Sequence, residues 1–176
     1  MSKSEYKHRK YHVEEYNPLW KDRFGADEKI LRGIWKSDAA AIEHIGSTSV
    51  PGMAGKPTID ILILVNDLAT VKMHSTRMVG EGYEFLPSYV MPDSYLFRRV
   101  EDNTLLTNVH IFQKDHPHVR EMIALRNYLR DHPETVKEYT AVKWALAEKY
   151  PDNYAQYRKE KDAYMDELKR KTGISH

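Results

Sequence analysis

The sequence predicts an α+β domain in which a small mixed β-sheet is followed by a helical C-terminal half. Residues 58–65 are apolar on both faces except at Asp60, which is typical of a buried central strand. Residues 95–100 and 105–112 form two further strand-like segments joined by a short polar turn. From residue 117 onward, apolar residues recur at helical spacing in three stretches separated by prolines. Mixed strands followed by a run of helices are the pattern of an α+β fold.

The length and composition fit one globular domain. A chain of 176 residues can bury a core of its own, and 41% hydrophobic and 30% charged residues are ordinary values. The sequence contains no cysteine, which excludes disulfides, thiolate chemistry and cysteine-ligated zinc. We expect residues 1–15 to form a flexible basic arm and residues 16–172 to form a single domain.

Charge and hydropathy argue against nucleic-acid and membrane partners. The formal net charge is +1, so no strong global field attracts nucleic acid or an anionic membrane. The first residues are polar and basic and lack the apolar run of a secretory signal. The longest apolar stretch, residues 61–65, is far too short to cross a bilayer. We therefore expect a cytoplasmic protein.

The first helix and strand are predicted from capping and spacing. Asn17 followed by Pro18 is a favourable helix start, since Asn caps the first turn and Pro fits within it. The large apolar residues that follow share one helix face: Trp20, Phe24, Leu31 and Trp35. Residues 39–45 then have the composition of a short strand.

The middle of the chain alternates loops and regular elements. Residues 46–57 form a loop or tight helical turn rich in small residues, and the buried strand over residues 58–65 comes next. A helix is predicted over about residues 67–78, because Gly80 and Gly82 end it.

The second half is predicted as a hairpin and three helices. The strands over residues 95–100 and 105–112 are joined across Glu101, Asp102 and Asn103, a turn-like connection. The helices span about residues 117–130, 133–150 and 153–171.

The small-residue loop after the first strand carries the groups best suited to binding an anion. Gly46 lets the backbone pass close to a ligand, while Ser47, Thr48 and Ser49 offer hydroxyl and backbone N–H groups. A helical turn that begins there directs its positive end at a bound anion. Lys56 adds a flexible positive charge suited to phosphate.

Asp60 is the most informative single residue. It lies on the buried strand, on the same face as Leu62 and Leu64, where a carboxylate is costly unless it is paired, hydrogen-bonded or metal-bound. One interpretation is structural: Asp60 caps a neighbouring loop, and the glycines only make turns. The other is that Asp60 serves a ligand. The Gly-Ser-Thr loop does not decide between them, because it matches neither a Walker loop nor a Rossmann fingerprint.

Each C-terminal helix carries one cation at a position where its apolar stripe predicts a hydrophobic residue. The three cations are Arg126, Lys143 and Lys161. One interpretation is that their stems lie along apolar surface while the charges reach water. The alternative is that all three converge on something anionic, either Asp60 and Glu43 or the phosphates of a ligand.

The histidines divide into two groups. His110 shares one face of a predicted strand with Asn108, and a histidine there can pack, bind metal, contact phosphate or act as a general base. His116 and His118 flank Pro117 in a polar turn, where we expect them to be solvated.

Residues 42–52 (IEHIGSTSVPG) and 56–61 (KPTIDI) together resemble the signature of the GrpB family. That family belongs to the polymerase-β-like nucleotidyltransferase superfamily. The likeness extends to residues 16–20 (YNPLW), 109–111 (VHI) and 126–133 (RNYLRDHP), and to a lysine-bearing C-terminal helix. The resemblance therefore covers most of the chain.

The resemblance implies a nucleotidyltransferase-like core that binds a nucleoside triphosphate with Mg²⁺, or with Mn²⁺, between the loop and Asp60. Asp60 and His110 are then the metal-binding and catalytic residues. The implied phosphate- and nucleotide-binding residues are Gly46, Ser47, Thr48, Ser49, Lys56, Arg126, Lys143 and Lys161.

Two positions depart from the pattern that the resemblance implies. The superfamily places two acids on the strand, separated by one apolar residue, and the second position is Leu62 here. The family's later strand usually carries a His-x-His pair, of which Asn108 replaces the first. Three hypotheses remain open: a nucleotidyltransferase-like enzyme with an unknown acceptor, a non-catalytic nucleotide- or anion-binding module, and a phosphate-handling enzyme of another reaction type.

Overall fold

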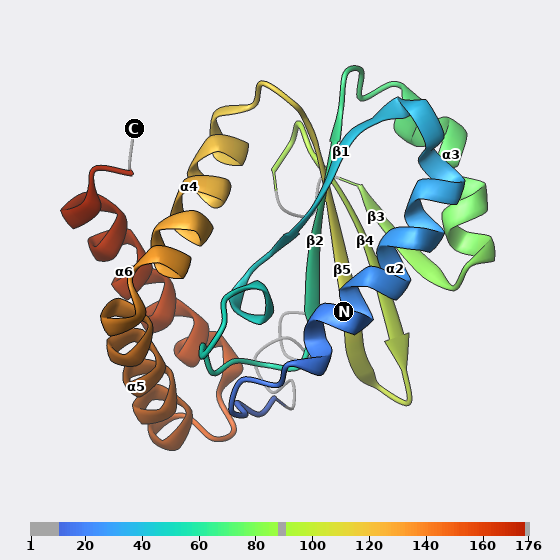
Figure 1. Ribbon diagram of the computed structural model, residues 1–176. Coiled ribbons are helices and arrows are strands. Elements are labelled where there is room, and N and C mark those ends of the chain that lie inside the picture. The colour runs from blue at the N-terminus through green and yellow to red at the C-terminus, as the bar shows by residue number, and fades with distance from the viewer. Residues whose placement is uncertain (1–10, 88–90, 175–176) are drawn as a thin grey trace.

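A five-stranded mixed sheet forms the centre of the protein, with helices on both of its faces (Figure 1). The computed structural model describes residues 11–87 and 91–174. The strands are β1 (Ala39–Ile45), β2 (Ile59–Val65), β3 (Tyr83–Pro87), β4 (Tyr95–Glu101) and β5 (Thr104–Gln113), and their order in the sheet is β1-β2-β5-β4-β3. Neighbouring strands are antiparallel except β2 and β5, which are parallel. The predicted α+β class is confirmed.

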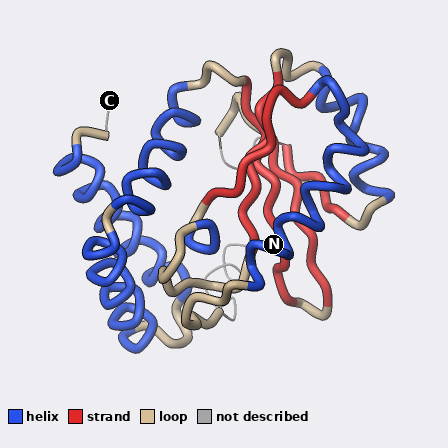
Figure 2. The backbone as a smooth tube through the Cα atoms, in the orientation of Figure 1, coloured by secondary structure: helices blue, strands red, loops and turns tan. Residues whose placement is uncertain are grey.

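The helices fall into two groups. Helices α2 (Leu19–Trp35) and α3 (Thr70–Gly80) cover one face of the sheet. Helices α4 (Pro117–Asp131), α5 (Pro133–Lys149) and α6 (Tyr154–Thr172) form the helical C-terminal half on the other side, which Figure 2 shows as a separate layer. Within the described residues, no helix combines the length and apolarity that a bilayer-spanning helix needs.

Strand β2 is buried on both faces because its side chains alternate between two apolar clusters. Ile61 and Ile63 belong to the main cluster, together with Trp35 of α2. Leu62 and Leu64 belong to a second cluster with residues of β5 and α4. This double burial explains the almost continuous apolar run. Asp60 interrupts the run at the end of the strand that adjoins the loop of residues 46–57.

Strand β3 was not predicted. It is one of the two edge strands of the sheet and pairs with β4, in a register that sets Phe85 opposite Phe97. Glu84 and Pro87 make the segment look less like a strand in the sequence. An edge strand can accept a proline, because the backbone on its outer side makes no hydrogen bonds to a neighbouring strand. Tertiary pairing with β4, rather than local preference, makes this segment a strand.

The predicted N-terminal arm extends too far along the chain. Residues 1–10 lie outside the described residues, but residues 11–15 are packed against the domain. Val13 is buried beside Ala54, and the Tyr11 hydroxyl donates to the Tyr150 carbonyl at 2.6 Å. Glu14 and Gly55 also exchange backbone hydrogen bonds of 2.9 and 3.0 Å. The buried side chain of Val13 and the backbone hydrogen bonds between Glu14 and Gly55 therefore hold these residues in place.

Candidate functional site

A cavity of about 400 Å³ lies between the sheet and the C-terminal helices. That volume is within the range of small-molecule sites. Its polar lining includes seven of the residues considered from the sequence: Ser47, Lys56, Asp60, His110, Arg126, Lys143 and Lys161. These residues come from β2, β5, all three C-terminal helices and the loop of residues 46–57, so the fold brings distant parts of the chain to one place.

The turn at Gly46 brings the loop backbone against Asp60. Gly46 has φ of 71° and ψ of −173°, a backbone conformation that residues other than glycine rarely adopt. A Cβ atom at this position would lie 2.6 Å from Oδ2 of Asp60, well inside van der Waals contact. Both the backbone angle and the close approach therefore require glycine, and the short helix η2 (Ser47–Ser49) follows directly.

Asp60 is ionised and held by polar neighbours on the adjacent strand. The Asn108 amide donates to Oδ1 of Asp60 at 2.8 Å, and Nε2 of His110 lies 3.9 Å from the same oxygen. Burial raises the pKa of Asp60, but His110, the Asn108 hydrogen bond and the charge of Lys56 outweigh it, so the pKa is lower than its ordinary value. The Asp60 side chain remains 30% exposed, which leaves the carboxylate accessible from the cavity.

Lys143 is the most buried cation of the site, with 1% of its surface exposed. Its Nζ donates to Oγ of Ser47 at 2.5 Å and to the Ala54 carbonyl at 2.8 Å, and it lies 4.4 Å from the centre of the Tyr139 ring. Burial lowers the pKa of Lys143 well below its ordinary value, and the positive charges of Lys161 and Lys56 lower it further.

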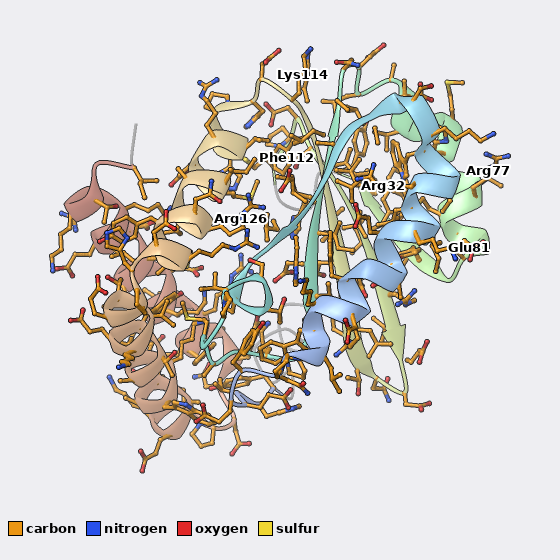
Figure 3. The ribbon with its side chains drawn as sticks, in the orientation of Figure 1. Arg32, Arg77, Glu81, Phe112, Lys114 and Arg126 are labelled. Carbon is orange, nitrogen blue, oxygen red and sulfur yellow. The ribbon has the colours of Figure 1, made fainter. Side chains whose placement is uncertain are left out.

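The other three cations considered from the sequence already have partners in the protein. Nζ of Lys56 donates to the Tyr154 hydroxyl at 2.8 Å. Nη1 of Arg126 donates to Glu43 at 2.7 Å and to the His44 carbonyl at 3.0 Å, so Arg126 spans from α4 to β1 (Figure 3). Nζ of Lys161 lies 2.6 Å from Asp162.

Thr48 and Ser49 do not line the cavity, although their hydroxyls were expected to face an anion. Oγ1 of Thr48 lies 2.9 Å from Nε2 of His44 and donates to the Thr58 carbonyl at 3.4 Å. Oγ of Ser49 donates to the Gly46 carbonyl at 2.7 Å. Both hydroxyls therefore stabilise the turn, because it folds back on itself and buries them. Of the four residues that begin the loop, only Gly46 and Ser47 reach the cavity.

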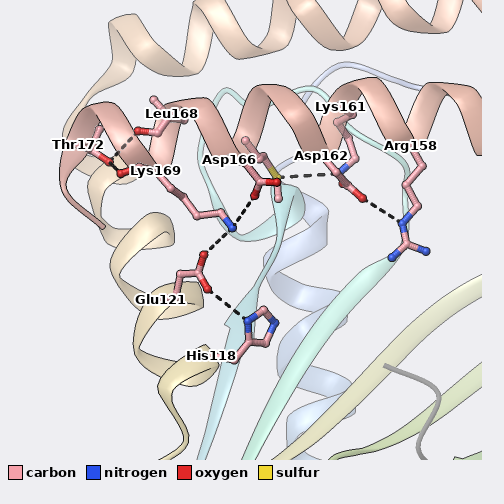
Figure 4. A network of polar contacts seen from close by, with 10 residues as sticks. His118, Glu121, Arg158, Lys161, Asp162, Asp166, Leu168, Lys169 and Thr172 are labelled. Carbon is pink, nitrogen blue, oxygen red and sulfur yellow. Dashed lines mark hydrogen bonds and ion pairs between the residues drawn. The ribbon is translucent and has the colours of Figure 1, made fainter. Parts of the chain in front are cut away.

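Sequence reasoning missed several residues of the cavity wall. Tyr154 and Arg158 of α6 line it, as does Asp162 beside Lys161. Arg158 and Asp162 lie one helical turn apart and form an ion pair at 3.3 Å (Figure 4). A four-residue spacing of opposite charges was the available signal, but it is common on exposed helices and says little about a site.

His116 and His118 are less solvated than expected. Both rings pack near Phe112, and His116 lies 3.0 Å from Asp93. His118 lies 3.4 Å from Glu121, which in turn pairs with Lys169 of α6 (Figure 4). The apolar ring of Phe112 and the acidic partners draw these histidines against the protein. They join α4 to β5 and α6, away from Asp60.

The metal-binding potential of the site rests on few donors. Asp60 and His110 face one another, but within the described residues no group of three or more histidine, aspartate or glutamate side chains is arranged to hold a metal. Leu62, at the position of the expected second acid, is fully buried in the apolar cluster beneath α4. Among the described residues, Asp60 and His110 are therefore the two side chains that could contribute to a metal site together.

Comparison with known proteins gives a match over nearly the whole domain. The family model described as GrpB protein matches residues 10–171. The chain belongs to the GrpB family. It is 33% identical over 160 residues to UPF0157 protein YqkA of Bacillus subtilis, covering 91% of this chain and 46% of that one. It is 34% identical to the glutamate-rich protein GrpB of Alkalihalophilus pseudofirmus, covering 85% of this chain and 88% of the relative. The chain thus spans about half the length of one of these relatives and most of the other.

Solved structures show the same fold. The conserved GrpB protein from Enterococcus faecalis superposes with a TM-score of 0.86 at 32% identity, covering 91% of this chain and 96% of that chain. The Cid1 poly(U) polymerase has a TM-score of 0.56 at 13% identity, covering 81% of this chain and 48% of the polymerase. At that identity the likeness shows a nucleotidyltransferase-like fold alone.

Proposed function

We propose that this GrpB-family protein binds a nucleoside triphosphate in the cavity and transfers a nucleotidyl group from it to an acceptor. The observation that carries the proposal is the convergence of Lys56, Arg126 and Lys161 on one cavity that also contains Asp60 and the buried amine of Lys143. Several cations from separate elements, gathered around a glycine-serine turn, are suited to a polyanion. A cavity of about 400 Å³ can enclose one nucleotide.

The phosphates would lie against the turn and the lysines. Ser47 and Lys143 are already in contact, and Lys56 lies on the same loop as Ser47. The nucleoside would lie along the apolar part of the wall, which includes Met122 and Leu125 of α4 and Met165 of α6.

A divalent ion fits this proposal as a companion of the nucleotide. Asp60 and His110 would hold the ion, with Mg²⁺ or Mn²⁺ as the expected metals, and it would neutralise charge on the phosphates. The protein contributes few ligands, so phosphate oxygens and water would complete the coordination. We therefore expect the ion to bind together with the triphosphate and only weakly without it.

A second candidate is a nucleotide- or anion-binding module without catalysis. Leu62 favours this candidate, because a leucine buried in an apolar cluster occupies the position where the resemblance predicts a second metal-binding acid. Asn108 favours it as well, since an amide occupies the position beside Asp60 and already bonds to it. Both candidates share the ligand and differ only in turnover.

A thermal-shift screen tests the shared part of the proposal. Nucleoside mono-, di- and triphosphates are each added with and without Mg²⁺ or Mn²⁺. A specific ligand at 100 times its dissociation constant should add about 2.7 kcal/mol of stability. We expect triphosphates with metal to stabilise the protein most. If no nucleotide stabilises it in any metal condition, the proposal is wrong.

Turnover separates the two candidates. The triphosphate that binds best is incubated with the protein and with candidate acceptors, and released pyrophosphate is measured. Release that requires both the protein and an acceptor supports transfer. Tight binding without release, across small-molecule and polymer acceptors, supports the binding module instead.

A further inference from the structure

Ser47 and Lys143 form a hydrogen-bonded pair at the cavity, and the fold builds this pair from distant segments. Lys143 lies on α5, 96 residues beyond Ser47, and its Nζ is 2.5 Å from the serine Oγ. Ser47 is half-buried and lines the cavity, while Lys143 is almost completely enclosed. Both residues line the cavity, and Ser47 is the more exposed of the two.

The loop is closely packed where Ser47 meets Gly55. A Cβ atom at Gly55 would lie 2.8 Å from Cβ of Ser47, so the beginning and the end of the loop are in contact at this point. The same atom would lie 3.9 Å from Nζ of Lys143. A glycine at position 55 thus allows the serine and the lysine to meet, and the Ala54 carbonyl beside it fixes the lysine with a second hydrogen bond of 2.8 Å.

The surroundings of Lys143 favour an uncharged amine. The charged groups that face it are Lys56 on the loop, Lys161 on α6 and Asp60 on β2, so two cations oppose one anion. Tyr139 faces it from α5 itself, and the Ser47 hydroxyl and Ala54 carbonyl complete the shell. Burial and the two neighbouring lysines lower the pKa of Lys143, and the carboxylate of Asp60 offsets only part of this effect. An uncharged amine has a lone pair that can accept the proton of the Ser47 hydroxyl.

We propose that Ser47 and Lys143 act as a nucleophile and its base, so that Ser47 can take up a nucleotidyl or phosphoryl group covalently. A bond forms between Oγ of Ser47 and the phosphorus atom, the bond from phosphorus to the leaving phosphate oxygen breaks, and the serine proton passes to Nζ of Lys143. The group then moves to an acceptor hydroxyl, whose proton goes to water, and Ser47 recovers its proton from Lys143. The nucleoside triphosphate as donor rests on the proposed function, whereas the reactive pair does not.

A covalent route also suits a site with one metal-binding acid. Direct transfer between two bound substrates relies on paired metal ions to hold the attacking and leaving oxygens. Position 62 supplies leucine in place of a second acid, which weakens that route. A covalent intermediate splits the transfer into two easier steps and depends less on metal.

A fluorophosphonate probe tests the pair without any nucleotide. An activated serine attacks its phosphorus and fluoride leaves, and peptide mass spectrometry locates the adduct. We expect the label on Ser47, no label there in Ser47→Ala, and a labelling rate reduced on the order of 100-fold in Lys143→Met, because general base assistance contributes about that much. Matched controls are Lys149→Met, an exposed lysine on the same helix, and Ser37→Ala, an exposed serine. Both should be labelled at the wild-type rate.

The pH dependence of labelling in the unmodified protein is a second test, which does not require Lys143→Met to fold. The rate should rise with pH and level off well below pH of about 10.4, where an ordinary lysine titrates. A rate that still rises through that range overturns the proposal, as does an unlabelled Ser47 or a folded Lys143→Met protein labelled as fast as wild type. Label on Ser47 without stabilisation by any nucleotide contradicts only the proposed function. Nucleotide binding without label on Ser47 contradicts only the reactive pair.

Discussion

Oδ2 of Asp60 lies 2.6 Å from the point where a Cβ atom of residue 46 would stand. The carboxylate and the glycine turn are therefore one unit: the turn cannot change without moving the carboxylate. Because β2 fixes Asp60 and Gly46 directly follows β1, the antiparallel pairing of Ile45 with Asp60 sets this contact. The geometry of the site thus depends on the strand pairing, and a side chain at position 46 would disturb it.

Gly46→Ala should destabilise the protein by about 2 kcal/mol and displace Asp60. At φ 71° and ψ −173° the backbone lies in a region open essentially to glycine, where another residue costs about 1–3 kcal/mol, and the added methyl group collides with the carboxylate. Gly25→Ala is the matched control, since a Cβ at that position in α2 meets nothing within 4 Å. It should stabilise the helix by about 0.5–1 kcal/mol. Urea melts of both variants check the difference, and equal effects would contradict the steric account.

Acid should destabilise the protein through His44. Burial lowers the pKa of His44 to about 4 in the folded protein, from about 6.5 in the unfolded chain. As pH falls from 7 to 4, the unfolded chain therefore binds more protons, and stability falls by on the order of 3 kcal/mol.

Urea melts between pH 7 and pH 4 measure this loss. His44→Gln should flatten the pH dependence by a similar amount, whereas His12→Gln, at a 65% exposed side chain, should not. Parallel pH curves for the wild type and His44→Gln would show that His44 does not carry the effect.

Asp27→Ala should cost about 3–5 kcal/mol without affecting the cavity. Asp27 is buried on the opposite side of the sheet, 2.7 Å from Arg99 and 2.8 Å from the Thr107 hydroxyl. Removing one member of a buried pair leaves the other charge uncompensated. Glu28→Ala, which breaks the exposed pair with Arg32, should cost less than about 1 kcal/mol. Similar losses in the two variants would contradict this interpretation of Asp27.

Arg126→Gln should weaken binding of pyrophosphate by about tenfold, the effect of losing one charge-assisted hydrogen bond. Glu43→Gln should act in the opposite direction, because it releases Arg126 from its 2.7 Å ion pair. Arg120→Gln, at an exposed arginine of the same helix, is the control and should leave binding unchanged. Titration calorimetry gives the three dissociation constants. Unchanged binding in Arg126→Gln would remove this residue from the site.

The order of the elements could be predicted from the sequence, because caps, prolines and periodicity mark most of them. For Arg126, Lys143 and Lys161 the sequence left two interpretations open, because a cation that interrupts an apolar stripe can direct its charge to water or to an anion; all three residues line the cavity. Strand β3 (Tyr83–Pro87) could not be predicted, since it exists through pairing with β4. Local sequence patterns therefore identify helices and central strands more readily than edge strands.

The contacts of the site could not be predicted. The inward turn of the Thr48 hydroxyl depends on where His44 lies, and the bond from Asn108 to Asp60 depends on the register of β2 against β5. The meeting of Lys143 with Ser47 depends on how α5 packs on the loop. Register and helix packing join residues far apart in sequence, and no spacing rule in the sequence encodes those distances.

The most direct test of the central claim compares nucleotide binding by the wild type and Asp60→Asn. The amide keeps the shape of Asp60 and can still accept the Asn108 hydrogen bond of 2.8 Å, but it removes the charge. Calorimetric titrations with the best nucleoside triphosphate are run with and without Mn²⁺, and urea melts follow the unliganded proteins. Asp22→Asn, at an exposed aspartate of α2, is the control.

If Asp60 serves a metal–nucleotide ligand, Asp60→Asn should change the stability of the unliganded protein by less than about 1 kcal/mol, because the amide keeps the hydrogen bond from Asn108 and the partly exposed contact with His110 is long, at 3.9 Å. The metal-dependent part of nucleotide binding should disappear, while the metal-independent part should persist. A loss of several kcal/mol in the unliganded variant, with metal-dependent binding unchanged, would show that Asp60 is structural and would contradict the account.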